Sequence, residues 1–186
     1  MDNRVCPPWI GYILLSPVRL LLENPKKMFG PFVRPGMTVL DLGCAMGFFS
    51  LPLAEMVGET GRVICVDVQQ KMLDVLRKRA RKKGLLDRIQ THLGRFDAIA
   101  LPDHDGRIDL VTAIHMLHET DDQAGILREI ADLLRPGGTV LIFEPPGHVD
   151  ADEFAKTIAL AEQAGLQRTD LAVKGRGLSA PLIKPD

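Results

Sequence analysis

Cysteine is scarce in this chain, and its few occurrences follow no recognisable spacing. Cys6, Cys44 and Cys65 are odd in number and far apart, whereas disulfide frameworks and zinc sites need sets of cysteines at regular spacings. We therefore expect no disulfide framework and no metal site. The same scarcity favours a reducing compartment, the cytoplasm.

A long hydrophobic segment is also missing. The longest apolar stretch covers residues 9–22, and Ser16, Pro17 and Arg19 interrupt it. It is shorter than the ~20 residues that a transmembrane helix requires. It also lacks the charged start and small-residue cleavage site of a signal peptide. We expect no stable membrane insertion, but a second reading places this stretch on a membrane surface.

The chain has no excess of positive charge. Its 23 lysines and arginines face 24 acidic residues, which gives a formal net charge of −1. Without a broad basic field the chain is poorly suited to hold a polynucleotide backbone, so no nucleic acid partner is expected. One basic cluster covers residues 77–83, and we interpret it as the solvated C-terminal end of a helix, where cations are favourable.

What remains is the composition of one globular domain. A chain of 186 residues with 46% hydrophobic residues can bury a full core but is too short for two ordinary domains. We assign residues 1–35 to an N-terminal arm, with a helix over about 17–29, and residues 36–186 to the domain itself. The sequence does not fix the oligomeric state, and a homodimer stays open.

Hydrophobic periodicity predicts an α/β fold. Strands near residues 37–42, 62–66, 89–93, 108–114 and 139–143 alternate with helices near 48–57, 69–83, 122–134 and 152–164. Such alternation with short connections indicates a doubly wound, mostly parallel Rossmann-like sheet with helices on both faces. Two last strands, near 166–173 and 178–183, should add an antiparallel hairpin through residues 175–177.

The central feature is the stretch Val39-Leu40-Asp41-Leu42-Gly43-Cys44-Ala45-Met46-Gly47. It begins as an apolar strand, continues through a turn with two glycines, and leads into a helix. Glycines allow backbone angles that residues with a Cβ resist, and the start of a helix offers free N–H groups. This arrangement is typical of a loop whose backbone approaches a ligand.

Polar residues follow the ends of several predicted strands. In a doubly wound sheet the carboxyl ends of the strands meet at one edge, where ligands bind. The residues that should meet there are Asp41, Asp67, Asp97, His115 and Glu144. We therefore predict one binding pocket at this edge.

Five motifs in order resemble those of the class I S-adenosylmethionine-dependent methyltransferases. They are V-L-D-L-G-C-A-M-G at 39–47, I-C-V-D at 64–67, D-A-x-x-L-P at 97–102, I-D-L-V-T-A-I-H-M-L-H at 108–118 and L-L-R-P-G-G-T-V-L-I at 133–142. The resemblance covers roughly residues 30–184 and implies the class I methyltransferase fold. It also implies S-adenosyl-L-methionine as cofactor and S-adenosyl-L-homocysteine as product.

The resemblance further implies which residues bind the cofactor. Gly43 and Gly47 would let the backbone lie against its methionine part, and Asp41 would orient the turn and the methionine amino group. Asp67 would accept hydrogen bonds from the ribose hydroxyls, because a carboxylate has two acceptor oxygens. Asp97 would accept from the adenine amino group. The remaining members of the set are Cys44, Ala45, Val68, Ala98 and Ile114.

One residue departs from the family pattern, and one rival family fits less well. Many members have glycine where this chain has Ala45, which raises the hypothesis of a non-catalytic S-adenosylmethionine-binding or regulatory protein with the same fold. A nicotinamide site is disfavoured, because the turn between Gly43 and Gly47 lacks G-x-G-x-x-G spacing.

Candidates for acceptor chemistry follow strands four and five. His115 is predicted to line the methyl-transfer face, with Glu144 and His118 as further catalytic candidates and His148 facing the substrate. The sequence shows no triad partner for any of them. A general base would add about 10²–10⁴-fold if the acceptor carries a proton.

The acceptor is expected to be a small molecule. Strand four lacks the N-P-P-Y or D-P-P-Y motif of nucleic-acid amino methylation, and the cysteine set of arsenical methyltransferases is absent. Trp9 and Tyr12 are predicted to belong to a lid that closes the pocket, although simple packing of the arm is an equal alternative. We conclude from the sequence that the chain is a small-molecule methyltransferase.

Overall fold

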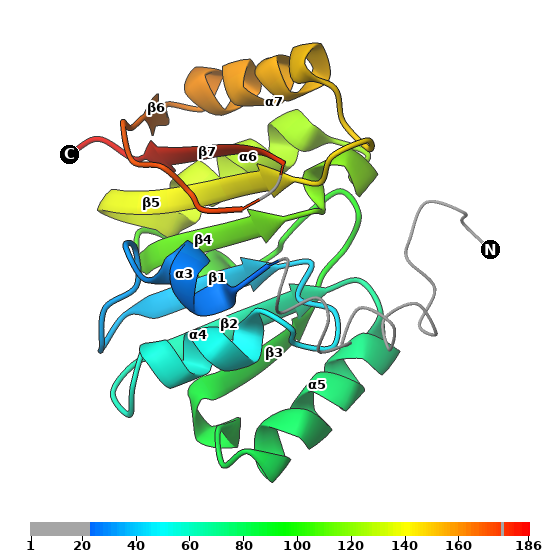
Figure 1. Cartoon of the computed structure of the whole chain (residues 1–186), viewed down its shortest axis with the longest axis vertical. Helices are drawn as coiled ribbons and strands as arrows, with labels where there is room; N and C mark the ends of the chain where they lie inside the picture. Colours follow the sequence, from blue (N-terminus) through cyan, green and yellow to red (C-terminus); the bar gives the residue numbers. More distant parts are fainter. Residues whose placement is uncertain (1–22, 176) are drawn as a thin grey trace.

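The computed structural model describes residues 23–175 and 177–186 (Figure 1). The predicted lid residues Trp9 and Tyr12 lie outside the described residues, as does the membrane-surface stretch up to residue 22. Among the described residues, no helix combines the length and apolarity needed to cross a bilayer.

Seven strands form one mixed sheet, which confirms the predicted fold class. Their order across the sheet is β3-β2-β1-β4-β5-β7-β6 (Figure 1). The strands are β1 (Thr38–Leu42), β2 (Arg62–Asp67), β3 (Ile89–Leu93), β4 (Ile108–Ile114), β5 (Leu134–Glu144), β6 (Gln167–Arg168) and β7 (Leu178–Ile183). The first five are mutually parallel, and β7 runs antiparallel to both β5 and β6.

Helices cover both faces of the sheet. The α-helices are α3 (Pro25–Phe29), α4 (Ser50–Met56), α5 (Gln70–Lys82), α6 (Gln123–Leu133) and α7 (Ala151–Gln163), with short 3₁₀ helices η1 (Leu86–Arg88), η2 (Pro102–His104) and η3 (Leu117–Glu119). Side chains of α3, α4 and α5 share one buried cluster with the sheet, and those of α6 and α7 share another. The parallel strands therefore lie between two helical layers.

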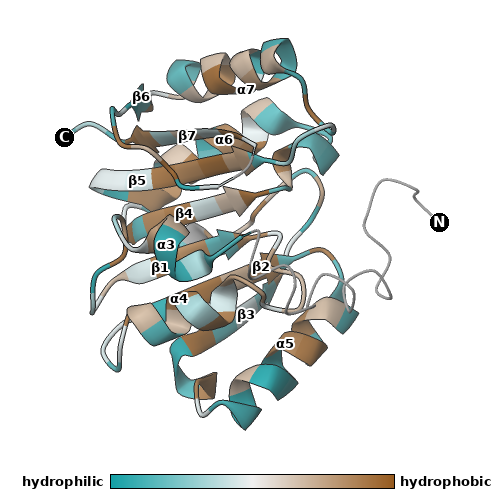
Figure 2. Cartoon of the chain, viewed as in Figure 1, coloured by the Kyte–Doolittle hydropathy of each residue, from teal (hydrophilic) through white to brown (hydrophobic). Residues whose placement is uncertain are grey.

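Alternation along the strands explains the two clusters. Leu40 and Leu42 pack toward α6, whereas Val39 packs toward α4. Successive side chains of a strand point to opposite faces, so a strand buried on both faces must be apolar almost throughout. Figure 2 shows the central strands largely in the hydrophobic colour range. Asp41 shares the α4-facing side of β1 with Val39, and it is buried there.

Three boundaries differ from the sequence prediction. The helix predicted over residues 17–29 is not helical at residues 23 and 24 and begins at Pro25. Asn24 precedes a proline, which favours extended backbone, and its side chain accepts from the N–H of Lys27 as an N-cap. Met28 and Phe29 are buried, so α3 packs into the domain core.

The other two differences concern the last strands. β5 begins at Leu134, five residues earlier than predicted, because Leu134 pairs with Ile108 before the register shifts to Thr139 opposite Leu110. Gly137 and Gly138 therefore lie in an irregularity within this strand. β6 comprises two residues where a strand of about eight was predicted, because Gln167 and Arg168 alone pair with β7.

Candidate functional site

The turn after β1 has three residues with left-handed backbone angles. Gly43 has φ +67°, Ala45 φ +45° and Gly47 φ +79°. A Cβ at Gly43 would lie 2.8 Å from Cβ of Met116, and one at Gly47 would lie 2.9 Å from Cγ of Leu76. Packing of neighbouring side chains therefore requires glycine at both positions. Gly43 is nevertheless exposed, so its backbone is accessible to a ligand.

Ala45 holds the same kind of conformation with a side chain. The αL region costs a non-glycine residue about 1–2 kcal/mol. Its backbone N–H donates to Oδ2 of Asp67 at 2.9 Å, which anchors the turn to the end of β2. The N–H of Cys44 donates to the carbonyl of Val66 at 3.1 Å. The alanine is thus accommodated in a turn of the expected shape.

Asp67 uses both carboxylate oxygens to hold backbone. Oδ2 accepts from Ala45, and Oδ1 accepts from the N–H of Gln69 at 2.8 Å. The side chain is largely buried, and burial raises the pKa of Asp67 while the two backbone hydrogen bonds lower it. Each oxygen keeps a second lone pair. The predicted ribose acceptor therefore also organises the loops on either side of it.

Asp41 lies beneath the turn rather than at its surface. Its Oδ2 accepts from the hydroxyl of Ser50 at 2.5 Å, and its Oδ1 accepts from the hydroxyl of Thr112 at 2.8 Å. Burial raises the pKa of Asp41 to about 6, against the lowering effect of these two hydrogen bonds. The carboxyl group joins β1, β4 and the first residue of α4. Its direct contacts thus hold the frame of the turn.

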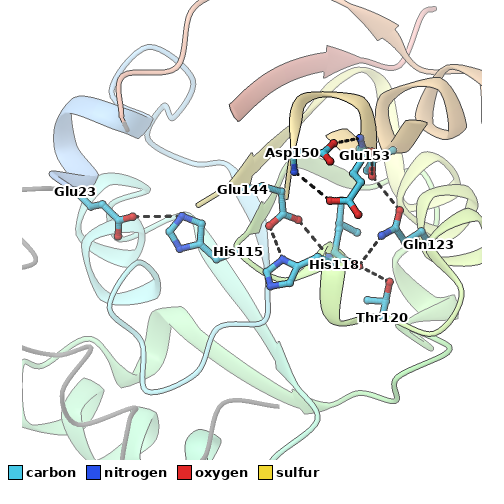
Figure 3. Close-up of polar contacts among 10 residues, drawn as sticks. Glu23, His115, His118, Thr120, Gln123, Glu144, Asp150 and Glu153 are labelled. Carbon is cyan, nitrogen blue, oxygen red and sulfur yellow. Dashed lines mark hydrogen bonds and ion pairs between the residues drawn. The ribbon is translucent and has the colours of Figure 1, made fainter. Parts of the chain in front are cut away.

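His118 and Glu144 form a short polar contact at this edge of the sheet. Nδ1 of His118 lies 2.6 Å from Oε2 of Glu144, and the His118 backbone N–H donates to Oε1 at 3.3 Å (Figure 3). Glu144 is 2% exposed, whereas the His118 side chain is 23% exposed. The sequence showed no triad partner for any catalytic candidate, and the structure places Glu144, itself a candidate, beside His118.

The other two predicted histidines lie on either side of this pair in the chain. His115 follows β4 with φ +58°, and its Nε2 lies 3.3 Å from Oε1 of Glu23 (Figure 3). The exposed His148 ring contacts the His118 ring edge-on, with centroids 5.6 Å apart. Non-glycine residues with positive φ are enriched at functional sites. Histidines from two strand ends thus gather near Glu144.

The loop over residues 95–100, which includes the predicted adenine contacts Asp97 and Ala98, is arranged around two carboxylates. The exposed side chain of Asp97 pairs with Arg95 through two contacts of 2.9 and 3.0 Å. This pairing lowers the pKa of Asp97. Glu129 of α6 accepts from the N–H groups of Ile99 and Ala100, each at 3.0 Å. Ala98 is half-buried between these anchors.

The predicted cofactor residues thus divide by exposure. Gly43, Ala45, Val68, Asp97 and Ala98 retain exposed surface, whereas Asp41, Cys44, Gly47, Asp67 and Ile114 are buried. The buried five shape the turn and the strand ends. Within the described residues, no group of three or more histidine, cysteine or acidic side chains is placed to hold a metal ion.

Several residues of the site escaped the sequence analysis. They are Glu23, Ser50, Gln69, Arg79, Thr112 and Glu119. Thr112 carried a signal, because it is a polar residue within a buried strand. Arg79 carried none, because it lies among the basic residues of α5. Its guanidinium donates to the carbonyl of Met46 and so pins the turn from behind.

Carboxylates dominate the electrostatics of this edge. Burial raises the pKa of Glu119, and the negative charges of Asp67 and Glu144 raise it further. A site with several buried carboxylates favours a cationic ligand. S-adenosylmethionine carries a positive sulfonium, and a ribose diol that suits Asp67. The accessible Gly43 backbone and this charge pattern fit the cofactor that the motifs imply.

Comparison with known proteins also identifies methyltransferases as relatives of this chain. Residues 39–138 match a family described as a methyltransferase domain. The chain is 40% identical over 120 residues to the demethylmenaquinone methyltransferase of Lactobacillus johnsonii, covering 64% of this chain and 48% of that protein. It is 34% identical over 111 residues to the ubiquinone/menaquinone biosynthesis C-methyltransferase UbiE of Shewanella frigidimarina, covering 60% and 43%.

A solved structure matches over nearly the whole chain. The SAM-dependent methyltransferase from Aquifex aeolicus has a TM-score of 0.85 and 26% identity, with 97% of this chain and 100% of that chain covered. The chain spans about half the length of the curated relatives it matches. Motifs, fold and family match agree, and the chain belongs to the class I S-adenosylmethionine-dependent methyltransferases.

Proposed function

We propose that this protein transfers the methyl group of S-adenosylmethionine to a small-molecule acceptor, for which a quinone-type compound is the leading class. The observation that carries the proposal is the turn after β1. Its exposed Gly43 leaves the backbone accessible, and the N–H of Ala45 anchors it to Asp67. Beside it lies the His118–Glu144 pair, which provides polar side chains for an acceptor.

Named residues would hold the cofactor. The backbone of Gly43 and Ala45 would contact the methionine part, and the free lone pairs of Asp67 would receive the ribose hydroxyls. Asp97 and Ala98 would contact adenine. When bound, S-adenosylmethionine supplies an electrophilic methyl group on a cationic sulfur. Most of the acceleration would come from holding acceptor and methyl group in line.

The acceptor would lie against the ends of β4 and β5. His115, His118, Glu144 and His148 are the side chains we assign to that side of the pocket. The quinone preference comes from the two curated relatives, whose names refer to demethylmenaquinone and to ubiquinone/menaquinone biosynthesis. We place the protein in the cytoplasm, because Cys44 and Cys65 are free thiols.

Calorimetry with S-adenosylhomocysteine tests the cofactor site. Asp67→Ala should weaken binding by about 1–3 kcal/mol, because it removes the ribose acceptor and the anchors of Ala45 and Gln69. Asp74→Ala is the matched control, since Asp74 is exposed on α5 and contacts only Gln70 among the described hydrogen bonds. Equal affinity of wild type and Asp67→Ala would contradict the assignment.

Turnover with a panel of acceptors tests the activity itself. Formation of S-adenosylhomocysteine with reduced quinones, but not with unreduced ones, is the expected result. Cofactor binding without turnover of any acceptor would instead favour a binding or regulatory protein with the methyltransferase fold.

A further inference from the structure

Glu144 is a buried acid with a dedicated partner. It closes β5 on the side of the sheet covered by α6 and α7, and 2% of its surface is exposed. A buried carboxylate is costly unless hydrogen bonds and an opposite charge compensate it. Both of its oxygens face His118, one toward the backbone N–H and one toward Nδ1 (Figure 3). The arrangement fixes the position of the imidazole.

The contact also fixes which ring nitrogen carries the proton. An ionised carboxylate accepts hydrogen bonds and cannot donate them, so Nδ1 of His118 must be the N–H donor. In the neutral ring, Nε2 then has the free lone pair. The His118 side chain is 23% exposed, so the ring reaches the surface of the site while its partner does not. The Nε2 atom of neutral His118 is thus the ring nitrogen that can accept a proton.

The groups around His118 raise its basicity. The hydrogen bond with Glu144 raises the pKa of His118 most, and the charges of Glu144 and Glu119 add to this, while burial lowers it. Within the described residues, the ring of His148 also contacts His118 edge-on. His115 is arranged differently, because its Nε2 faces the carboxylate of Glu23. In His115, the nitrogen that corresponds to the accepting Nε2 of His118 therefore already has an acidic neighbour.

We propose that His118 is the general base of methyl transfer, that Glu144 is its positioning residue, and that the acceptor carries an acidic hydroxyl of the phenol or enol class. This inference rests on the proposed function and names its acceptor chemistry. A phenol, with a pKa of about 10, is within reach of an imidazole base, whereas an aliphatic alcohol is not.

The proton and electron balance is simple. The hydroxyl proton of the acceptor passes to Nε2 of His118, and the electron pair left on the acceptor forms the new bond to the methyl carbon. The carbon–sulfur bond breaks with its electron pair on sulfur, which becomes a neutral thioether. His118 then releases the proton to water. No oxidant or further reactant is consumed.

The pH dependence follows from this role. Only neutral His118 accepts a proton, so kcat/KM should rise with pH and level off above the pKa of His118. Glu144→Gln removes the charge that raises this pKa but keeps the shape of the side chain. The midpoint of the pH profile should therefore move to lower pH in Glu144→Gln. A merely structural role for Glu144 would change the rate without moving the midpoint.

The experiment combines NMR with kinetics on the full chain. The Cε1–H resonance of His118 is titrated in wild type and Glu144→Gln, and methylation of naphthohydroquinone is followed across the same pH range. We expect the kinetic midpoint to coincide with the titration midpoint in each protein. His118→Ala should lose about 10²–10⁴-fold in kcat and regain part of it with added imidazole. His92→Asn, a histidine of β3, is the matched control.

Each alternative outcome has a distinct meaning. Failure of S-adenosylhomocysteine to bind wild type would overturn the proposed function itself. Binding of S-adenosylhomocysteine together with unchanged kcat in His118→Ala would overturn the base, as would a kinetic midpoint that Glu144→Gln does not move. Methylation of naphthohydroquinone dimethyl ether, which has no hydroxyl proton, would overturn the acceptor class. So would cofactor binding with no methylation of naphthohydroquinone at any pH.

Discussion

Asp41 illustrates how one buried residue can hold the frame of a site. It occupies the family's acidic position before the glycine turn, yet its carboxyl group is buried between Ser50 and Thr112. Hydrogen bonds to two hydroxyls compensate part of the desolvation cost. The residual cost is visible in its pKa of about 6. The frame of the turn is therefore maintained at the expense of some stability at neutral pH.

This cost predicts a pH dependence of stability. The pKa of Asp41 is higher in the folded protein, at about 6, than its ordinary value of 3.8. The native state therefore binds the Asp41 proton more tightly than the unfolded state does. The stabilisation from this proton is fully present below the unfolded pKa of 3.8. It is lost as the pH rises through the folded pKa of about 6. For Asp41 the loss should be about 2 kcal/mol between about pH 4 and pH 7.

Asp41→Asn should remove this dependence. The amide can still bond both hydroxyls, since Ser50 and Thr112 can accept as well as donate. Urea unfolding at the two pH values measures the difference, with Asp74→Asn as the exposed control. If wild type and Asp41→Asn lose stability equally as the pH rises, the buried carboxyl is not the source.

At the scale of elements, α5 acts on the turn as well as on the core. Its inner face is apolar, with Met72, Leu73, Leu76 and Ala80 buried. Leu76 also requires glycine at position 47, because a Cβ at Gly47 would clash with the Leu76 side chain. Most basic residues of its C-terminal half are exposed, as expected of a solvated helix end. Arg79 differs, because its half-buried guanidinium reaches the carbonyl of Met46.

The contact between Arg79 and the turn after β1 leads to a prediction about cofactor binding. Burial lowers the pKa of Arg79, but the guanidinium remains charged and donates to the turn. Arg79→Gln should leave that carbonyl without its donor and weaken S-adenosylhomocysteine binding by about 1–2 kcal/mol, since the turn is less firmly held. Arg77→Gln changes an exposed neighbour on the same helix and should have no effect. Calorimetry on both variants distinguishes a specific contact from a general effect of helix charge.

At the scale of the whole molecule, the N-terminal part of the chain leads to the site. Glu23 is the first described residue, and its carboxylate lies 3.3 Å from Nε2 of His115 at the end of β4. The chain then continues into α3, whose Phe29 ring packs edge-on against Phe49 beside the turn, with centroids 5.6 Å apart. The described chain therefore begins beside the residue that follows β4.

The lid hypothesis predicts an optical signal. Trp9 is the only tryptophan of the chain, so its fluorescence reports on the arm alone. Addition of S-adenosylhomocysteine should change the emission saturably, and removal of residues 1–16 should abolish turnover while cofactor binding persists. A closed lid excludes water and covers the acceptor, which explains why binding and turnover would separate. Unchanged emission together with full activity of the shortened chain would leave the arm as simple packing.

The sequence determined the order of strands and helices along the chain. Period-two and helical apolar patterns depend on local spacing, so they place β1, β2 and β4 to within a residue. The glycine turn and the acidic strand ends follow from motifs for the same reason. The parallel order of the strands then brings Asp67, His115 and Glu144 to one edge, as predicted from topology alone.

Only the tertiary structure decided which side chains pair. His118 and Glu144 are 26 residues apart, and Asp41 and Thr112 are 71 apart. Their contact depends on strand order, register and side-chain direction, none of which local spacing encodes. For the same reason, the sequence could not show that Asp41 lies below the turn. Nor could it show that Glu144, the last residue of β5, pairs with His118 and not with His115. Burial and partner choice arise from packing between distant segments, and these decide the chemistry of each group.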